Sequence, residues 1–302
     1  MRIEDRSLLE MTPGMRLAIF LAASGISLII GALIAFSVVA AYLHVGFSGI
    51  QAVLMQPGNG HVSLFANAFA SLIAFLIPSI AVAFFTRGAI VENMGFKPVL
   101  SYNLVKWVVL LAFSGLLLSG ALASLTEFIP IPTHFRNWAN GLEETYKKAM
   151  MAMTQMNSFW DLIINLLAVA IIPAIVEEIY FRGALQKTLR DWTGKPVLAI
   201  LITAIVFSAF HFSYFGFLSR MALGVLLGLI FEYTKTIWLP ILLHFINNGM
   251  AVIALYSVRG DQHKIDKVMD QNFPLYWIII ATALVSYLLY KLKQASNYER
   301  LD

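Results

Sequence analysis

The sequence lacks cysteine and carries little charge. The absence of cysteine excludes disulfide bonds, thiolate zinc sites, iron–sulfur clusters and a cysteine nucleophile. Charged residues make up 13% of the 302 residues, about half of the roughly 25% that a soluble domain carries. Hydrophobic residues make up 59%, more than a water-soluble core needs. This composition predicts a polytopic membrane protein, and the thinly spread net charge of +4 gives no indication of a nucleic-acid partner.

Apolar runs recur along the chain, and a helical span needs about 20 apolar residues. The eight candidate spans are residues 15–43, 62–86, 104–126, 159–186, 196–213, 219–233, 237–256 and 275–291. We therefore expect an all-α, polytopic transmembrane helix bundle of about eight spans, forming one integral-membrane domain over residues 1–302. The longest polar break, at about 127–158, fits either an amphipathic helix on the membrane surface or a solvated loop helix.

The distribution of Lys and Arg predicts the orientation, because these residues are enriched in cytoplasmic loops. With the N-terminus inside, 13 of the 21 Lys and Arg residues fall in inside segments and 7 in outside segments. The first apolar run is too long for a signal-peptide core, so we expect a retained helix. We expect an integral protein of the plasma (inner) membrane with both termini in the cytoplasm.

Polar residues interrupt the apolar pattern at three places inside the expected spans. They are Glu177, Glu178 and Arg182 in "VEEIYFRGAL", Phe207 and His211 in "FSAFHF", and His244 and Asn248 in "LLHFINNG". A charged side chain in hydrocarbon costs roughly 2.5 kcal/mol or more, so such residues are candidates for function.

In the first of these motifs, the two neighbouring carboxylates have different expected roles. Glu178 and Arg182 are four residues apart and share a helix face, where a guanidinium can hold a carboxylate in bidentate fashion. Glu177 lies about 100° around the helix and has no local partner. We therefore expect Glu178 to be neutralised and structural, and Glu177 to be the chemical residue.

The other two motifs supply imidazoles and an amide. His244 and Asn248 share a helix face and can both donate to one oxygen, while His211 has Phe207 one turn beneath it. These groups and Glu177 lie on three helices and could meet in one interior cavity. The alternative is structural, since a membrane His or Asn often only bonds a neighbouring helix and a Glu–Arg pair can be an anchor.

The motifs fit the patterns E-E-x-x-x-R, F-x-x-x-H and H-x-x-x-N, in that order along the chain. This ordered set resembles the CAAX protease and bacteriocin-processing (CPBP, or Abi) family of intramembrane endopeptidases, which includes the Ras-converting CAAX endopeptidase of eukaryotes. The resemblance covers about residues 159–256, which would form the catalytic half of the chain. It implies a CAAX prenyl protease-like enzyme that hydrolyses a peptide bond with an activated water. The implied roles are Glu177 as the base, His211 as its partner, His244 and Asn248 as the oxyanion-stabilising pair, and Glu178, Arg182 and Phe207 as supporting residues.

The resemblance leaves the metal question open. Two imidazoles and one carboxylate make a legitimate zinc set with an open fourth position, so Glu177, His211 and His244 are candidate zinc ligands. The family is classed with the metalloproteases, whereas the alternative is a metal-free Glu–His mechanism. Zinc is the one cofactor indicated.

The expected partners are the lipid bilayer and a peptide or protein substrate that is lipidated or membrane-bound. The alternative function is a non-catalytic membrane scaffold or a transporter with a buried polar cluster, because intramembrane charges also mark ion pathways. The chain shows no inverted repeat of the kind that many transporters carry.

Overall fold

The computed structural model describes residues 11–54, 56, 58–98, 101–270 and 273–298, and this part of the chain is helical, without strands. The helices are α1 (Pro13–Leu43), α2 (Ile50–Leu54), α3 (Gly60–Phe84), α4 (Ile90–Asn93), α5 (Tyr102–Phe128), α6 (Thr133–Met153), α7 (Phe159–Asn165), α8 (Ile172–Glu178), α9 (Lys187–Thr193), α10 (Pro196–Ala209), α11 (Phe217–Thr234), α12 (Trp238–Ser257), α13 (Gln262–Asp270) and α14 (Tyr276–Tyr298). Two π-helical segments, Leu166–Ile171 and Ile179–Gln186, join α7, α8 and α9 into one helix of 35 residues. The predicted all-α polytopic bundle is confirmed.

Among the described residues, seven helices are long and apolar enough to cross a membrane, so the chain is an integral membrane protein. They are α1, α3, α5, the continuous helix Phe159–Thr193, α11, α12 and α14. The remaining expected span, residues 196–213, differs, because α10 has 14 residues and ends at Ala209. At 1.5 Å per residue α10 is about 21 Å long, short of the roughly 30 Å hydrocarbon core. The sequence stays apolar past its end, but Phe212 has a left-handed backbone with φ of 49°.

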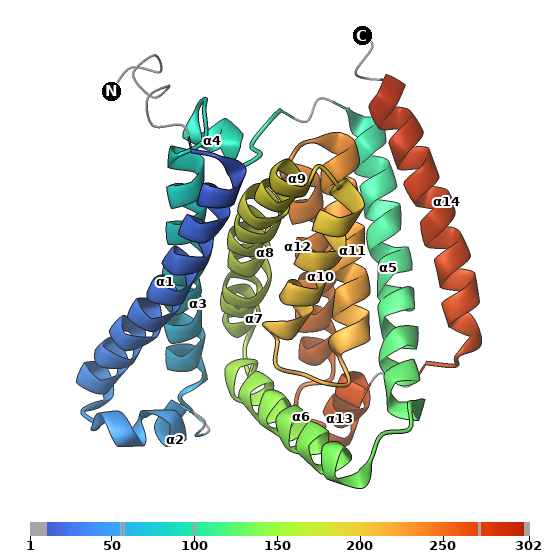
Figure 1. Cartoon of the computed structure of the whole chain (residues 1–302). Helices are drawn as coiled ribbons and strands as arrows, with labels where there is room; N and C mark the ends of the chain where they lie inside the picture. Colours follow the sequence, from blue (N-terminus) through green and yellow to red (C-terminus); the bar gives the residue numbers. More distant parts are fainter. Residues whose placement is uncertain (1–10, 55, 57, 99–100, 271–272, 299–302) are drawn as a thin grey trace.

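The two ends of the bundle differ in their helices. α1 begins and α14 ends at one end, whereas α6 and α13 lie at the opposite end (Figure 1). For α1 to begin and α14 to end at the same end, the short α10 must run between the two ends as the seven long helices do. Residues 1–10 and 299–302 lie outside the described residues, so the cytoplasmic position of the termini stays a prediction.

The helices of the expected catalytic half form the centre of the molecule. α1 packs against α3 on one flank and α5 against α14 on the other, with α7–α12 between these pairs (Figure 1). Buried apolar side chains fill this centre, including Phe181, Phe207, Leu227 and Leu243. Because aliphatic and aromatic side chains surround the central helices, any polar group among them must find partners inside the bundle.

The polar break at 127–158 contains a helix, as both interpretations of the sequence predicted. α6 crosses the end of the bundle away from the start of α1 (Figure 1). Its Phe135 and Trp138 lie against Tyr214 in the loop between α10 and α11, with ring centroids 5.7 and 6.4 Å apart. α6 is therefore packed onto the loop that begins beside His211.

Candidate active site

The helix Phe159–Thr193 positions the two glutamates midway along its length. It begins with a capping box, in which Ser158 and Asp161 bond each other's backbone N–H groups, and Gly194 follows its end with φ of 66°. Glu177 and Glu178 end the short α-helical stretch between the two π-helical segments. π-helical turns within α-helices occur frequently at functional sites.

A proline one turn before the glutamates leaves a backbone carbonyl of this helix without its usual donor. Pro173 has no N–H, so it cannot donate to the carbonyl of Val169 as an α-helix requires. Asn248 of α12 donates to that carbonyl instead, with Nδ2 3.2 Å from the oxygen. The amide has a second N–H, which stays available for another acceptor.

Glu178 is at the centre of a buried polar cluster. Its side chain and that of Arg182 have no exposed surface, and Arg182 Nη1 donates to Glu178 Oε1 at 2.8 Å. His244 Nδ1 lies 2.9 Å from the same oxygen. The predicted pair is present, but it is not bidentate, because Arg182 Nη2 donates to the carbonyl of Gly224 at 3.1 Å. The guanidinium thus links two helices instead of binding one carboxylate with both nitrogens.

His244 lies between the two glutamates. Its Nδ1 faces Glu178, a carboxylate already paired with Arg182, so we place a proton on Nδ1. Its Nε2 faces Glu177 Oε2 at 3.9 Å, too far for a direct hydrogen bond. The Glu177 side chain is 16% exposed, and its Oε2 has no hydrogen-bond partner. The sequence predicted that the side chains of Glu177 and Glu178 point in different directions, and the structure gives them different surroundings.

His211 approaches the cluster through Phe207. Its Nδ1 lies 2.9 Å from the Phe207 carbonyl, which can only accept, so Nδ1 carries a proton and Nε2 is an acceptor in the neutral ring. The Phe207 ring lies 5.0 Å from the His211 ring, 5.7 Å from the His244 ring and 4.9 Å from the Arg182 guanidinium, measured from its centroid. Phe207 is therefore a shared packing surface for both imidazoles. No hydrogen bond or ion pair joins His211 to Glu177 in the described part of the chain, and His244 is the imidazole nearest that carboxylate.

The loop after His211 is held by α6. Ser213 Oγ donates to Glu143 Oε2 at 2.7 Å, and the Arg220 guanidinium lies over the Tyr146 ring at 4.6 Å. These contacts, with the aromatic packing at Tyr214, fix one end of the loop that follows His211. No sequence signal indicates these contacts, because the pattern of an amphipathic helix does not show which loop the helix covers.

Two further contacts were missed by sequence reasoning. Asn247 Nδ2 donates to Asn248 Oδ1 at 3.2 Å and so fixes the orientation of the Asn248 amide. Gln186, buried within the bundle, donates through Nε2 to the Gly228 carbonyl at 3.1 Å. The spacing of Gln186 four residues after Arg182 is the signal that could have indicated it.

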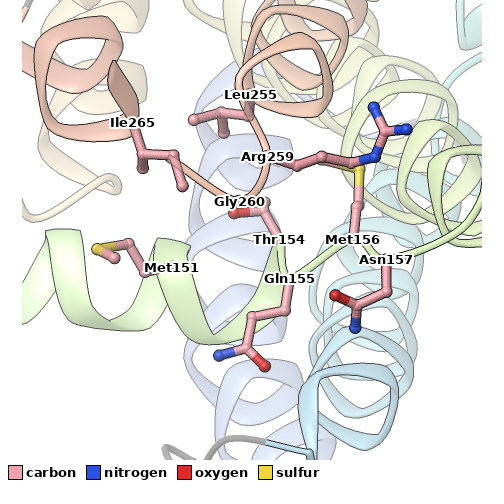
Figure 2. Close-up of a pocket in the computed structure, with 9 residues that line it drawn as sticks. All are labelled: Met151, Thr154, Gln155, Met156, Asn157, Leu255, Arg259, Gly260 and Ile265. Carbon is pink, nitrogen blue, oxygen red and sulfur yellow. The ribbon is translucent and has the colours of Figure 1, made fainter. Parts of the chain in front are cut away.

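Two cavities in the described part of the chain are lined by residues outside the predicted site. Figure 2 shows a cavity of about 190 Å³ where the end of α6 meets the α12–α13 connection, lined by Gln155, Asn157 and Arg259 among others. A second, apolar cavity of about 280 Å³ lies between the α8 helix and α12, lined by Ile175 and Phe245 among others. None of the predicted site residues lines either cavity.

The candidate zinc ligands do not form a metal site as they are arranged. Within the part of the chain that the structure describes, no three His, Asp or Glu side chains gather so that they could hold a metal ion. The Nδ1 atoms of His211 and His244 are engaged by the Phe207 carbonyl and by Glu178.

Comparison with known proteins finds a similarity over the helices that carry this site. Residues 159–250 match the family model described as type II CAAX prenyl endopeptidase Rce1-like, which confirms the resemblance seen in the motifs. The chain is also 31% identical over 105 residues to the uncharacterized protein YpbD of Bacillus subtilis (strain 168), covering 33% of this chain and 51% of that protein. The chain thus spans about half the length of this curated relative. No solved structure matches the chain.

Proposed function

We propose that the chain is an intramembrane endopeptidase of CAAX prenyl protease type, because residues 159–250 match the Rce1-like family model of type II CAAX prenyl endopeptidases. The observation that carries this proposal is the pair of adjacent glutamates inside an apolar bundle. Glu178 is held by Arg182 and His244, while Glu177 faces His244 across 3.9 Å without a hydrogen-bond partner on Oε2. A scaffold needs the first carboxylate but has no use for the second.

The nucleophile in this proposal is a water bound by Glu177 and the two imidazoles. A water beside the line from Glu177 Oε2 to His244 Nε2 can contact both atoms, because they are 3.9 Å apart. His211 Nε2, an acceptor while Nδ1 donates to Phe207, is the partner that helps to orient this water. Glu177 takes a proton from the water as its oxygen attacks the carbonyl carbon of the peptide bond.

The remaining groups stabilise the intermediate and complete the cleavage. In this proposal His244 is an imidazolium ion from the start, held between Glu177 and Glu178, and its Nε2–H donates first to the water and then to the carbonyl oxygen as that becomes an oxyanion. The second N–H of Asn248 donates to the same oxyanion, and His244 keeps its proton throughout. Glu177 then gives its proton to the leaving nitrogen as the carbon–nitrogen bond breaks. The products are a new carboxyl group and a new amine. No step is routed through zinc, because the described side chains do not gather three ligands.

The substrate in this proposal is a membrane-bound peptide or protein, lipidated or not, because the site lies within a membrane-spanning helix. A scaffold keeps the buried cluster but makes no use of Glu177, whereas a transporter would use this carboxylate to carry a proton and would leave protein termini unchanged.

A survey of protein termini in membranes of the native host tests the proposal. The host would carry the wild type, Glu177→Gln, or the matched control Glu144→Gln, which makes the same change on the exposed surface of α6. New termini should appear with the wild type and the control and be lost with Glu177→Gln at equal abundance. Identical termini in all three strains would overturn the peptidase assignment and favour the scaffold or the transporter.

A further inference from the structure

Three contacts of equal spacing join the helix Phe159–Thr193 to α11. Arg182 Nη2 donates to the Gly224 carbonyl at 3.1 Å and Gln186 Nε2 to the Gly228 carbonyl at 3.1 Å. One turn further, Arg190 Nη1 lies 3.5 Å from a carboxylate oxygen of Glu232. Each pair is 42 residues apart, so the two helices run parallel with one register over three successive turns. We call these contacts the ladder.

One glycine of α11 makes the middle rung possible. A Cβ added at Gly228 would lie 2.8 Å from Gln186 Oε1, whereas the atoms nearest to one added at Gly224 belong to Ala204 and Phe207 of α10. The missing side chain at Gly228 therefore leaves room for Gln186, and the one at Gly224 lets α11 approach α10. The G-x-x-x-G pattern at 224–228 therefore does more than let helices approach closely.

The π-helical segment keeps the ladder straight. In a regular α-helix, residues four apart drift about 40° around the axis at each step, since 3.6 residues make one turn. The wider turn of the segment Ile179–Gln186 offsets part of that drift. Arg182, Gln186 and Arg190 thus stay on the face directed at α11.

The ladder starts at the catalytic cluster. Arg182 uses one nitrogen for the first rung and another for Glu178, which in turn bonds His244 on α12. A slip of the helix against α11 would therefore move Glu178 and its neighbour Glu177 relative to His244.

We propose that Gln186 is a positioning residue of the active site, acting as the middle rung that fixes the register of the catalytic helix against α11 and so holds the glutamates at His244. This role rests on the proposed peptidase function, but the register itself can be measured without activity. Gln186 is buried and lies two turns from Glu178, so it acts only through the helix.

The absence of cysteine allows a direct measurement of register in the full-length chain in membranes. Arg190→Cys with Glu232→Cys places one thiol on each helix at the outer rung, where Gln186 becomes the last hydrogen bond holding that end. A short bis-reactive thiol reagent should crosslink this pair. Adding Gln186→Met, which keeps the side-chain length but removes the donor, should lower the crosslinking yield several-fold.

Thr203→Val is the matched control. Thr203 is buried on α10 with no hydrogen-bond partner for its hydroxyl, and it lies outside the ladder, so this nearly isosteric change removes a buried polar group without altering a rung. The control should crosslink as the parent does. An equal yield for Gln186→Met and Thr203→Val would overturn the proposal.

Turnover adds a second readout, with a peptide identified by the survey of termini as the substrate. Gln186→Met in the otherwise native chain should lower kcat by up to about 100-fold at unchanged KM, because small displacements of catalytic groups act on the chemical step. Thr203→Val should leave both constants unchanged. A Gln186→Met enzyme with native kcat would also overturn the positioning role. If the wild type cleaves nothing, the peptidase proposal fails, while crosslinking still decides the register.

Discussion

Two faces of one helix carry the same chemical group in opposite surroundings. On one face, Glu178 has no exposed surface and bonds both Arg182 and His244 through Oε1. On the adjoining face, Glu177 is 16% exposed, and its nearest charged partner is His244 Nε2, 3.9 Å from Oε2. The residues are sequence neighbours, and only the 100° step between them separates the two surroundings. One face uses a carboxylate to hold the bundle together, and the other leaves a carboxylate free to exchange a proton.

Removing Arg182 should have the largest effect, because it breaks the paired face. Arg182→Ala leaves the Glu178 charge buried and unpaired, which typically costs about 3–5 kcal/mol. We expect abundance in membranes and activity to fall together. Lys148→Ala, which breaks the exposed pair with Glu144 on α6, is the control and should leave both unchanged. Wild-type abundance of Arg182→Ala would show that the pair is dispensable.

The two imidazoles extend the comparison, because His244 lies beside both glutamates and His211 bonds neither. His244→Ala and His211→Ala should each lower kcat by about 100-fold or more, as expected for groups that hold or move protons. Only His244→Ala should also lower thermal stability, since it removes a hydrogen bond to buried Glu178. Turnover and thermal unfolding of the two purified variants would check this. A greater loss of stability in His211→Ala would contradict the arrangement.

Asn248 should show an intermediate effect. Loss of an oxyanion donor typically lowers kcat by about 100- to 1,000-fold, and Asn248→Ala also removes the donor to the Val169 carbonyl. The neighbouring change Asn247→Ala only allows the Asn248 amide to rotate and should lower kcat less. Kinetic constants for both variants test the order. Equal losses would mean that the Asn248 amide acts only through its contact with Asn247.

Metal removal should have the smallest effect. The described side chains do not gather three ligands, so activity should survive prolonged treatment with a chelator followed by dialysis. Loss of activity that returns on adding zinc would show that the site rearranges into a metal centre.

The sequence predicted much of this arrangement, and the reasons for its failures are specific. The i, i+4 spacing correctly indicated the Glu178–Arg182 contact, because helix geometry is local. The same spacing could not show that Arg182 shares its donors with Gly224, since that contact joins residues 42 apart. The short α10 was missed because the aromatic residues after Ala209 keep the hydropathy high while the backbone turns at Phe212. The donation of Asn248 to the Val169 carbonyl and the packing of α6 on the loop after His211 also depend on tertiary contacts.

The most direct test of the division between the two faces is a side-by-side measurement of Glu177→Gln and Glu178→Gln. Both variants would be purified, and turnover and thermal unfolding would be measured on the same preparations. Glu177→Gln should lose turnover at unchanged stability, whereas Glu178→Gln should unfold at a lower temperature because Arg182 loses its ion pair. Stability lost in Glu177→Gln and kept in Glu178→Gln would contradict the account.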